Sequence, residues 1–435
     1  MLKIKKEFNK TCGKWISLGL VTLVPFSNLY ASAFALNEQN TSGLGNAYAG
    51  RAAIAEDAST SFYNPAALVK FKKPQVLASL VNPVADFDAR MIRATRAING
   101  AVITNGKATD NAAEYVPIPA FHLAGPINNT MAYGLSVTAP FGLATEYSKT
   151  SQFRYFATRS ELKTIDVNPN VAFKIDNQWS VGVGVSAQYA EATLARQFDN
   201  TGLGLTTDGS LKIKGDDIGY GYNLGVWYQT PNSTKLGFAF RSKIRHDLDG
   251  SIKVKNIAPA ASISNQDATA SVTLPEVASI SAFQSLTTDW DVMGDITYTN
   301  WHRFKKLVVK FPDSALASSV VEERFKDVFK FALGANYRCG QGVTWKFGTA
   351  YDQSPVKTKH RTFRVPDSDR VWLSAGMKYN VYNNLALDLG YSHIFLSNSK
   401  INETPISAAP LNNATSSAKV KSSINLIGLQ LTYDL

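Results

Sequence analysis

Regular alternation of apolar and polar residues dominates this chain. In residues 179–189 the odd positions are Trp, Val, Val, Val, Ala and Tyr, whereas the even positions are Ser, Gly, Gly, Ser and Gln. Residues 371–381 repeat the pattern, and residues 427–435 place Ile, Leu, Leu, Tyr and Leu on one face. A period of two predicts β-strands. Apolar faces that end in aromatic residues and lie opposite faces rich in Gly, Ser and Asn are typical of membrane β-barrels.

Fourteen segments show this strand pattern. They lie near residues 75–86, 116–125, 131–140, 162–175, 178–194, 219–230, 234–248, 271–285, 290–299, 326–338, 343–353, 369–381, 384–396 and 421–435. Six short turns alternate with seven longer polar loops, and the turns lie at residues 126–129, 176–177, 231–233, 287–289, 340–342 and 383–384. This arrangement predicts an all-β fold, a 14-stranded antiparallel transmembrane β-barrel with both ends in the periplasm.

The N-terminus has the pattern of a secretory signal. Basic residues up to Lys14 precede a 12-residue apolar stretch at 15–26, and Ala31-Ser32-Ala33 follows. We expect residues 1–33 to be a signal peptide cleaved after Ala33, with Ala35 as the second choice. The apolar stretch is too short to span a bilayer, and no later stretch reaches about 18 apolar residues. A secreted soluble protein or an outer-membrane barrel remains, and the alternation favours the barrel.

Residues 36–66 show neither a strand period nor an amphipathic helix period. Glycines interrupt any long helix, and alanines fill much of the rest. Small side chains allow a backbone to pack closely inside another structure, whereas Leu44, Tyr48 and Phe62 are too apolar for a solvated tail. Asn64-Pro65 predicts an extended or turned exit, because Pro disfavours the α region for the residue before it.

Charge and chemical motifs exclude several classes of function. The net charge is +11, and residues 1–33 contribute +4 (five Lys, one Glu), which leaves +7 without a basic run or a nucleic-acid-binding motif. The five histidines show no metal-binding spacing, no Gly-x-Ser-x-Gly motif occurs, and two cysteines exclude a zinc cluster. We therefore expect no enzyme, no cofactor, no metal site and no nucleic-acid partner. The acidic pairs Asp216-Asp217 and Glu322-Glu323 are expected in loops, as solvated charges or lipopolysaccharide cation sites.

Several short motifs appear in a fixed order just after the signal. LNE, SGLGNAYAG, AIAEDAS and NPA are followed by FGLATEY, QYAEATLARQF and LPE. Together they resemble the FadL/TodX family of outer-membrane transporters for hydrophobic compounds. The resemblance implies an N-terminal hatch at residues 34–70 that plugs a monomeric barrel at 71–435, in the outer membrane of a Gram-negative bacterium. It also implies that Asn64, Pro65 and Ala66 end the plug close to a gap in the wall.

The third predicted strand is interrupted at Ala139, Pro140, Phe141 and Gly142. Pro removes a donor from the strand ladder and is confined to edges, strand starts or bulges. One explanation is that the strand ends here in a turn. The resemblance implies instead that an inward kink opens a lateral gap in the barrel wall. A polar residue of the family is replaced by Ala139, so the side chain at this position should make no polar contact with the hatch.

The resemblance also implies a ligand pocket. Leu194 matches an apolar lining residue, Arg196 a head-group arginine, and Phe34 an N-terminal aromatic residue that reaches into the pocket. The carboxylate of a bound fatty acid would need a charged partner inside the barrel, and Arg196 could supply it. The alternative is that Arg196 is an ordinary lumen-facing or loop arginine without a role in binding. Val321 occupies the position of a second basic residue, and Arg324 is a candidate substitute.

The expected function is passive uptake of long-chain fatty acids or similar hydrophobic molecules, which leave sideways through the gap. One alternative is uptake of aromatic or aliphatic hydrocarbons by the same barrel. The other is a surface adhesin or antigen that transports nothing. Lipopolysaccharide and outer-membrane lipids are the expected surroundings.

Overall fold

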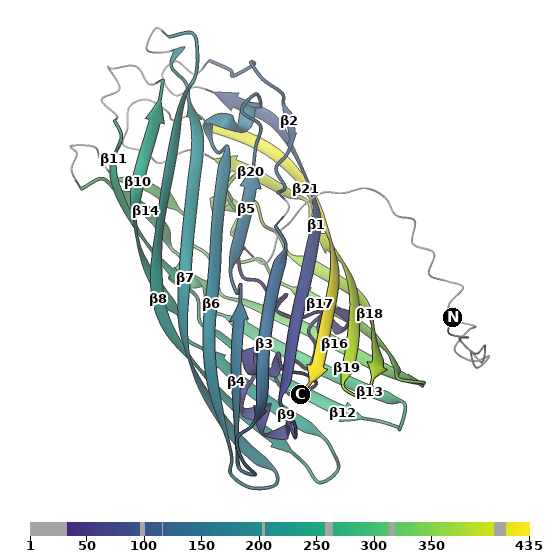
Figure 1. Ribbon diagram of the computed structural model, residues 1–435. Helices are drawn as coiled ribbons and strands as arrows, with labels where there is room; N and C mark the ends of the chain where they lie inside the picture. The colour runs from purple at the N-terminus through teal and green to yellow at the C-terminus, as the bar shows by residue number, and fades with distance from the viewer. Residues whose placement is uncertain are drawn as a thin grey trace, which may run out of the picture.

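A closed antiparallel 14-stranded β-barrel encloses the N-terminal part of the chain (Figure 1). The computed structural model describes residues 33–95, 101–114, 116–201, 205–256, 264–312, 318–403 and 415–435. Apart from Ala33, the expected signal peptide lies outside the described residues. None of the helices in the described ranges is long and apolar enough to cross a membrane.

The wall strands, several of which are broken into two pieces, follow one another around the barrel. They are β1 (Gln75–Thr95), β3 (Ile118–Pro126), β4 and β5 (Met131–Thr138, Gly142–Glu146), β6 (Arg159–Lys174), β7 (Trp179–Phe198), β8 (Gly209–Gln229), β9 and β10 (Lys235–Arg241, Ile244–Lys255), β11 and β12 (Gln266–Leu274, Val277–Ser285), β13 and β14 (Trp290–Thr299, Lys306–Lys310), β15 and β16 (Ser319–Glu322, Val328–Gly340), β17 (Val343–Asp352), β18 (Arg370–Tyr382), β19 and β20 (Leu385–Leu396, Ser399–Glu403) and β21 (Thr415–Asp434). β2 (Thr109–Asn111), η4 (Gln152–Tyr155), η7 (Trp301–Arg303) and η8 (Thr358–His360) lie in the long connections.

Pairing of the first and last strands closes the barrel. β1 pairs with β21 from Gln75↔Asp434 to Thr95↔Thr415, so the predicted 14-stranded barrel is confirmed. The short turns lie at the end of the barrel where the C-terminus lies (Figure 1). β1, β8 and β21 extend beyond the segments predicted from sequence. Their additional residues place mostly polar side chains on the outer face, because a strand that extends above the bilayer does not need an apolar outer face.

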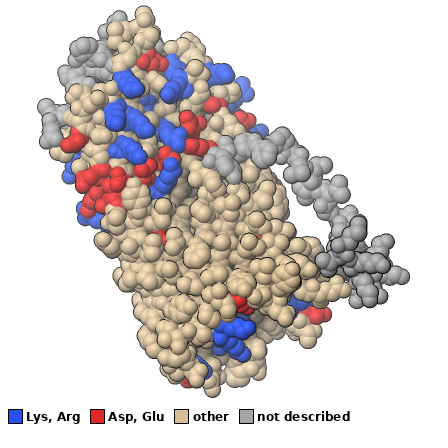
Figure 2. Space-filling view, viewed as in Figure 1, with Lys and Arg blue, Asp and Glu red and all other residues tan. Residues whose placement is uncertain are grey.

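The alternation of the sequence corresponds to the two faces of the wall. On β7, Val183 and Val185 are 43% and 61% exposed, whereas Ser180 and Gln188 are 1% exposed. Apolar residues therefore face outward and polar residues face the interior, as predicted. On the face that Figure 2 shows, the result is a broad belt with very few charged side chains between two charged ends.

Residues 34–70, the hatch, lie inside the barrel. They contain η2 (Leu44–Asn46), α2 (Thr60–Tyr63) and η3 (Pro65–Lys70). η2 lies against β17, β18 and β19, whereas η3 lies against β6, β7 and β8. Two wall glycines permit this close approach, because a Cβ atom at Gly182 would collide with the backbone of Ala66 and one at Gly225 with the side chain of Asn64.

An ion network attaches the hatch to the opposite wall. The Glu56 carboxylate lies 2.7 Å from the Lys346 ammonium and 3.3 Å from that of Lys378, and Lys346 also lies 3.3 Å from Asp388. Burial tends to raise the pKa of Glu56, but the two ammonium groups outweigh it and lower the pKa to about 2. Since Lys346 is 1% exposed, its charge depends on these carboxylates for compensation.

We predict that Glu56→Gln loosens the hatch at pH 7 without disrupting the barrel. Removing one partner of a buried charge should lower the free energy of hatch opening by about 1–3 kcal/mol. Because the folded pKa is depressed, the same stabilisation should be lost in the parent protein as pH falls from 4.5 toward 2. Hydrogen exchange of the hatch amides measures both effects. Glu322→Gln, which removes a solvent-exposed pair with Arg324, is the control, and equal exchange in both variants would contradict the prediction.

Candidate functional site

The third wall strand is interrupted between Thr138 and Gly142. β4 ends at Thr138, which pairs with Asp166, and β5 begins at Gly142, which pairs with Lys163. The chain thus takes four steps where β6 takes three, so one extra residue forms a bulge. Pro140, in the middle of this bulge, has no N–H to donate to a neighbouring strand.

Beyond the bulge the wall separates. β3 pairs with β4 as far as Phe121↔Val137. Between β3 and β5 the described residues form no ladder, and the nearest link on that side is an isolated bridge between Ala113 and Thr145. Beside residues 139–144, at a place that we call the opening, no ladder among the described residues therefore joins β3 to β5, although the chain continues along β6 as β5.

The start of the hatch fills the inner side of this opening. The Gln39 side chain accepts a hydrogen bond from the Ala139 N–H at 3.1 Å and donates one to the Ala139 carbonyl at 2.9 Å. The Leu36 N–H donates to the Pro140 carbonyl at 2.9 Å, and the Gly142 N–H donates to the Phe34 carbonyl at 2.8 Å. The polar contact between position 139 and the hatch is thus made by the backbone of Ala139. A polar side chain is not needed at this position.

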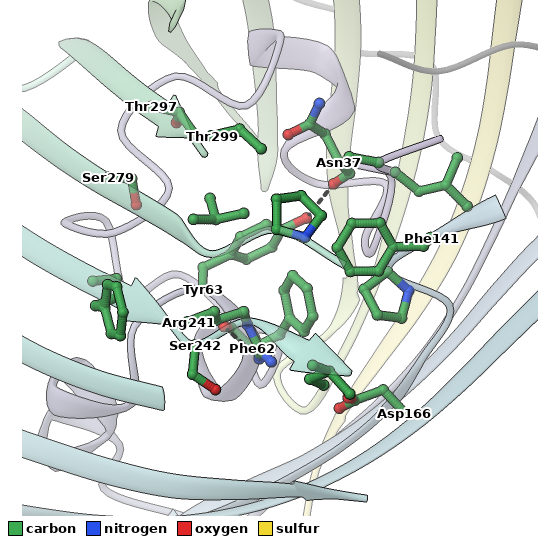
Figure 3. Close-up of a pocket in the computed structure, with 18 of the residues that line it drawn as sticks. Asn37, Phe62, Tyr63, Phe141, Asp166, Arg241, Ser242, Ser279, Thr297 and Thr299 are labelled. Atoms are coloured by element: carbon green, nitrogen blue, oxygen red, sulfur yellow. Dashed lines mark hydrogen bonds between the residues drawn. The ribbon is translucent and has the colours of Figure 1, made fainter. Parts of the chain in front are cut away.

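Cavities lie on both sides of the bulge. The lumen cavity (Figure 3) is lined by Leu36, Phe62, Pro140 and Phe141, together with polar residues such as Asp166. Many of its polar groups already have partners. Gln188 and Ser186 each donate to Asp166 at 3.2 Å. On the outer side, an apolar groove is lined by residues that include Leu80, Phe121, Val137, Ala139 and Leu429.

A second internal cavity, the upper cavity, lies nearer the long loops. Phe34, Leu194, Leu248, Leu307 and Val365 contribute to its mostly apolar lining. Phe34 is 3% exposed, and its ring contacts Trp301 at 4.5 Å and Phe304 at 5.4 Å between centroids. Phe34 and Phe141 are also neighbours, at 6.4 Å. Phe141 lines the lumen cavity and Phe34 lines the upper cavity. The two neighbouring rings therefore lie between the two cavities.

The upper cavity has a charged side. Arg364, in the loop before β18, lines it together with Glu323. The guanidinium of Arg364 donates to the Ser160 hydroxyl at 3.0 Å and to the Phe156 carbonyl at 3.1 Å. Burial lowers the pKa of Arg364, and the nearby carboxylates Glu403 and Glu323 oppose this change.

Glu323 is a buried carboxyl group facing the same cavity. It is 3% exposed, and within the described part of the chain its Oε2 atom has no hydrogen-bond partner. Burial, assisted by the charge of Glu403, holds the pKa of Glu323 well above its usual range, although Arg364 opposes this. Expecting Glu323 to be a solvated loop charge was therefore wrong, as was expecting Asp216 in a loop, because Asp216 lies within β8.

The predicted ligand residues are distributed unevenly around this cavity. Phe34 and Leu194 both line it. Arg196 lies two residues beyond Leu194 on the same face of β7, where it interacts electrostatically with Arg364 and Glu403. Arg324 does not approach the cavity lining. Its side chain is 61% exposed and is paired with Glu322 at 2.7 Å.

Asn64, Pro65 and Ala66 lie away from the opening, contrary to the expectation. The Asn64 side chain donates to the carbonyls of Ala52 at 2.7 Å and Val226 at 3.1 Å, and Ser180 donates to the Ala66 carbonyl at 2.8 Å. Asn64, Pro65 and Ala66 thus attach the end of the hatch to β7 and β8. The free backbone groups of the bulge are satisfied instead by the extended residues 34–39.

A comparison of the whole chain with models of protein families shows to which family it belongs. The family model described as "Outer membrane protein transport protein (OMPP1/FadL/TodX)" matches residues 23–435. The chain belongs to the FadL/TodX family. It is accordingly an outer-membrane transport protein for hydrophobic compounds, located in the outer membrane of a Gram-negative bacterium.

Individual FadL/TodX relatives match over most of their length. A long-chain fatty acid transport protein from Escherichia coli O6:H1 is 30% identical over 411 residues, covering 87% of this chain and 90% of the relative. Outer membrane protein P1 of Haemophilus influenzae is 30% identical and covers 98% and 99%. A FadL homologue from Pseudomonas aeruginosa has a similar fold, with a TM-score of 0.86, 23% identity and coverage of 92% and 99%.

Proposed function

We propose that this FadL/TodX protein takes up long-chain fatty acids, or similar amphipathic acids, by passive diffusion. The observation that supports it best is the upper cavity, a mostly apolar space with the partly buried guanidinium of Arg364 at its side. An acyl chain gains free energy by leaving water for such a lining. Its carboxylate gains a charge-assisted hydrogen bond to a guanidinium. A hydrocarbon would use only the first of these contributions.

We propose further that the ligand passes Phe34 into the lumen cavity and leaves laterally at the bulge. The lumen cavity and the outer groove approach the bulge from opposite sides, at Pro140 and Ala139 respectively. Exit into the membrane suits an apolar solute, which gains nothing by crossing water. Movement of residues 34–39, which occupy the inner side of the opening, would have to precede release. No enzymatic step is part of this proposal.

We expect expression of this protein to restore uptake of labelled oleate in cells that lack their own fatty-acid transporter. Import should saturate with oleate concentration and require no ATP. Parallel assays with toluene and hexadecane distinguish the hydrocarbon alternative. Import of hydrocarbons alone would replace the fatty-acid proposal. Correct surface assembly with no import of any of these compounds would favour the adhesin or antigen alternative.

We predict that oleate binding weakens as pH rises through the raised pKa of Glu323, and that Glu323→Gln removes this dependence. Below that pKa the neutral carboxyl can donate a hydrogen bond to the ligand carboxylate, whereas above it two negative charges meet. Glu403 and Arg364 act on the pKa of Glu323, and Glu161 and Lys214 also line the upper cavity. Equilibrium binding to the purified protein between pH 6 and 9 measures the slope. A slope that persists in Glu323→Gln would assign the titration to another group.

We also propose that the protein acts as a monomer and that its outer surface contacts lipopolysaccharide. A closed barrel has no free strand edge with which to pair, and it surrounds the whole proposed route. The alternating register that exposes the apolar belt supports direct contact with lipid around the entire wall.

A further inference from the structure

The lumen cavity is lined by three cations, more than a purely apolar route requires. Arg51, Arg241 and Lys330 all contribute to its lining, together with the carboxylates of Asp166 and Asp352. A fatty acid that passes from the upper cavity to the opening must bring its carboxylate through this space. Because an anion inside a barrel needs a charged or hydrogen-bonding partner, the cation that is available to it decides where the head group rests.

Arg241, the last residue of β9, is held in place but incompletely bonded. Its Nη2 atom donates to the Phe62 carbonyl at 2.9 Å and to the Asn168 side-chain oxygen at 3.1 Å, and its Cζ atom lies 3.9 Å from the centre of the Phe62 ring. In the described ranges its buried Nε atom has no hydrogen-bond partner, and no ion pair joins Arg241 to a carboxylate. A guanidinium that is fixed in this way and keeps an unused donor is preorganised to receive a carboxylate.

The other two cations of the lumen cavity are already compensated. The Nε atom of Arg51 lies 3.7 Å from the Asp295 carboxylate. The Lys330 ammonium also has no hydrogen-bond partner among the described residues. However, it lies 4.3 Å from the centre of the Trp372 ring, and nearby carboxylates act on its charge. Since an aromatic face stabilises an ammonium group without an anion, Arg241 is the cation best placed to bind a new carboxylate.

An apolar surface extends from Arg241 toward the opening. In Figure 3, Phe62 and Tyr63 lie between Arg241 and Phe141, which belongs to the bulge. Asp166 lines the same cavity and pairs in the ladder with the last residue of β4, just before the bulge. A ligand carboxylate close to the opening would meet the like charge of Asp166, whereas an acyl chain would not.

We propose that Arg241 forms a second carboxylate-binding subsite, in the lumen cavity, and that a long-chain acid bound there enters the opening tail first. The head group would pass from Arg364 in the upper cavity to Arg241. The acyl chain would then extend over Phe62 toward Phe141 and the apolar groove outside. This inference rests on the proposed uptake of acids, to which it adds a position and an orientation of the ligand.

Two photoreactive stearic acids test the orientation, one with a diazirine beside the carboxyl group and one with a diazirine at the chain end. The mature protein in detergent is labelled over a range of probe concentrations, and the modified peptides are identified by mass spectrometry. The carboxyl-end probe should label residues 239–244, and the chain-end probe should label residues 139–143. Equal labelling of both segments by both probes, or the reverse assignment, would overturn the proposal.

Variants test the subsite itself. Arg241→Gln should raise the concentration of carboxyl-end probe needed for half-maximal labelling of residues 239–244 about ten- to a hundredfold. Arg241→Lys retains the charge and should raise it by a smaller factor. Asp166→Asn should lower it, because a like charge is removed. Lys330→Met should leave it unchanged, and a loss of labelling in this variant but not in Arg241→Gln would assign the head group to Lys330 and overturn the subsite.

Because Arg241 also contacts the hatch, all variants are first compared by heat-modifiable migration, which reports an intact barrel. If Arg241→Gln does not assemble, Arg241→Lys and Asp166→Asn decide the question, because a carboxylate subsite requires opposite shifts from them. Labelling of Phe34 and Leu194 in the upper cavity tests the proposed function separately. Labelling there without labelling of residues 239–244 would refute this inference alone, whereas no labelling in either cavity would contradict the uptake of acids.

Discussion

Deleting Pro140 is expected to reduce uptake to the level of cells without the transporter, while the purified protein still binds oleate. The deletion removes the extra residue of the bulge. Thr138 and Gly142 would then be three steps apart, as are their partners Asp166 and Lys163. β4 and β5 can join as one regular strand, with no residue left to turn inward and hold the wall open.

Two further variants separate the extra residue from the proline itself. Pro140→Ala keeps the chain length, so the bulge and most of the uptake should persist. Pro140→Thr/Gly142→Val also keeps the length, but it restores an N–H group and adds strand-favouring side chains. A Cβ at position 142 would press on the end of the Leu36 side chain, which can move. Uptake by the double variant should therefore be intermediate.

Initial rates of labelled oleate import, normalised to the amount of heat-modifiable protein in the outer membrane, measure these effects. Parental import by the deletion variant would show that lateral exit at this strand is wrong. The ligand would then have to pass through the hatch into the periplasm, and the Glu56→Gln variant should in that case speed import.

The parts of this molecule set by local pattern were predictable, and those set by distant contacts were not. Alternation and turn residues determine which face of each strand meets lipid, so strand number and orientation follow from the sequence. Pro140 likewise marks the bulge through its own missing donor. In contrast, Gln39 resembles any polar residue of the hatch until folding brings it next to Ala139, 100 positions away.

The charged side of the upper cavity was missed for the same reason. Arg364 lies in a polar loop, and its sequence neighbours do not distinguish it from Arg324, which is exposed. Only the folded chain brings the loop before β18 to the start of β6, where Ser160 and, just before the strand, Phe156 hold the guanidinium. No feature of the neighbouring sequence indicates that a loop arginine will reach a cavity formed by distant residues. Phe34 and Leu194, in contrast, lie in or next to motifs of the family, and these motifs suggested them.

Arg364→Ala is expected to weaken oleate binding about ten- to a hundredfold while leaving the affinity for hexadecane nearly unchanged. A charge-assisted hydrogen bond contributes roughly 1.5–3 kcal/mol, and only the acid can form it. Arg196→Ala should lower the affinity for oleate by a smaller factor, because Arg196 acts on the same region through its charge without lining the cavity. Isothermal titration of both ligands with each variant gives the comparison.

Because Arg364 also donates to Ser160 and Phe156, its removal could disturb the cavity itself. Arg364→Lys retains the positive charge and should recover part of the oleate affinity, and Arg324→Ala removes an exposed arginine and should change neither ligand. An equal loss for oleate and hexadecane in Arg364→Ala would mean that this arginine supports the cavity wall and does not bind the carboxylate. Selectivity for acids over hydrocarbons would then have to come from another group, with Arg196 as the next to test.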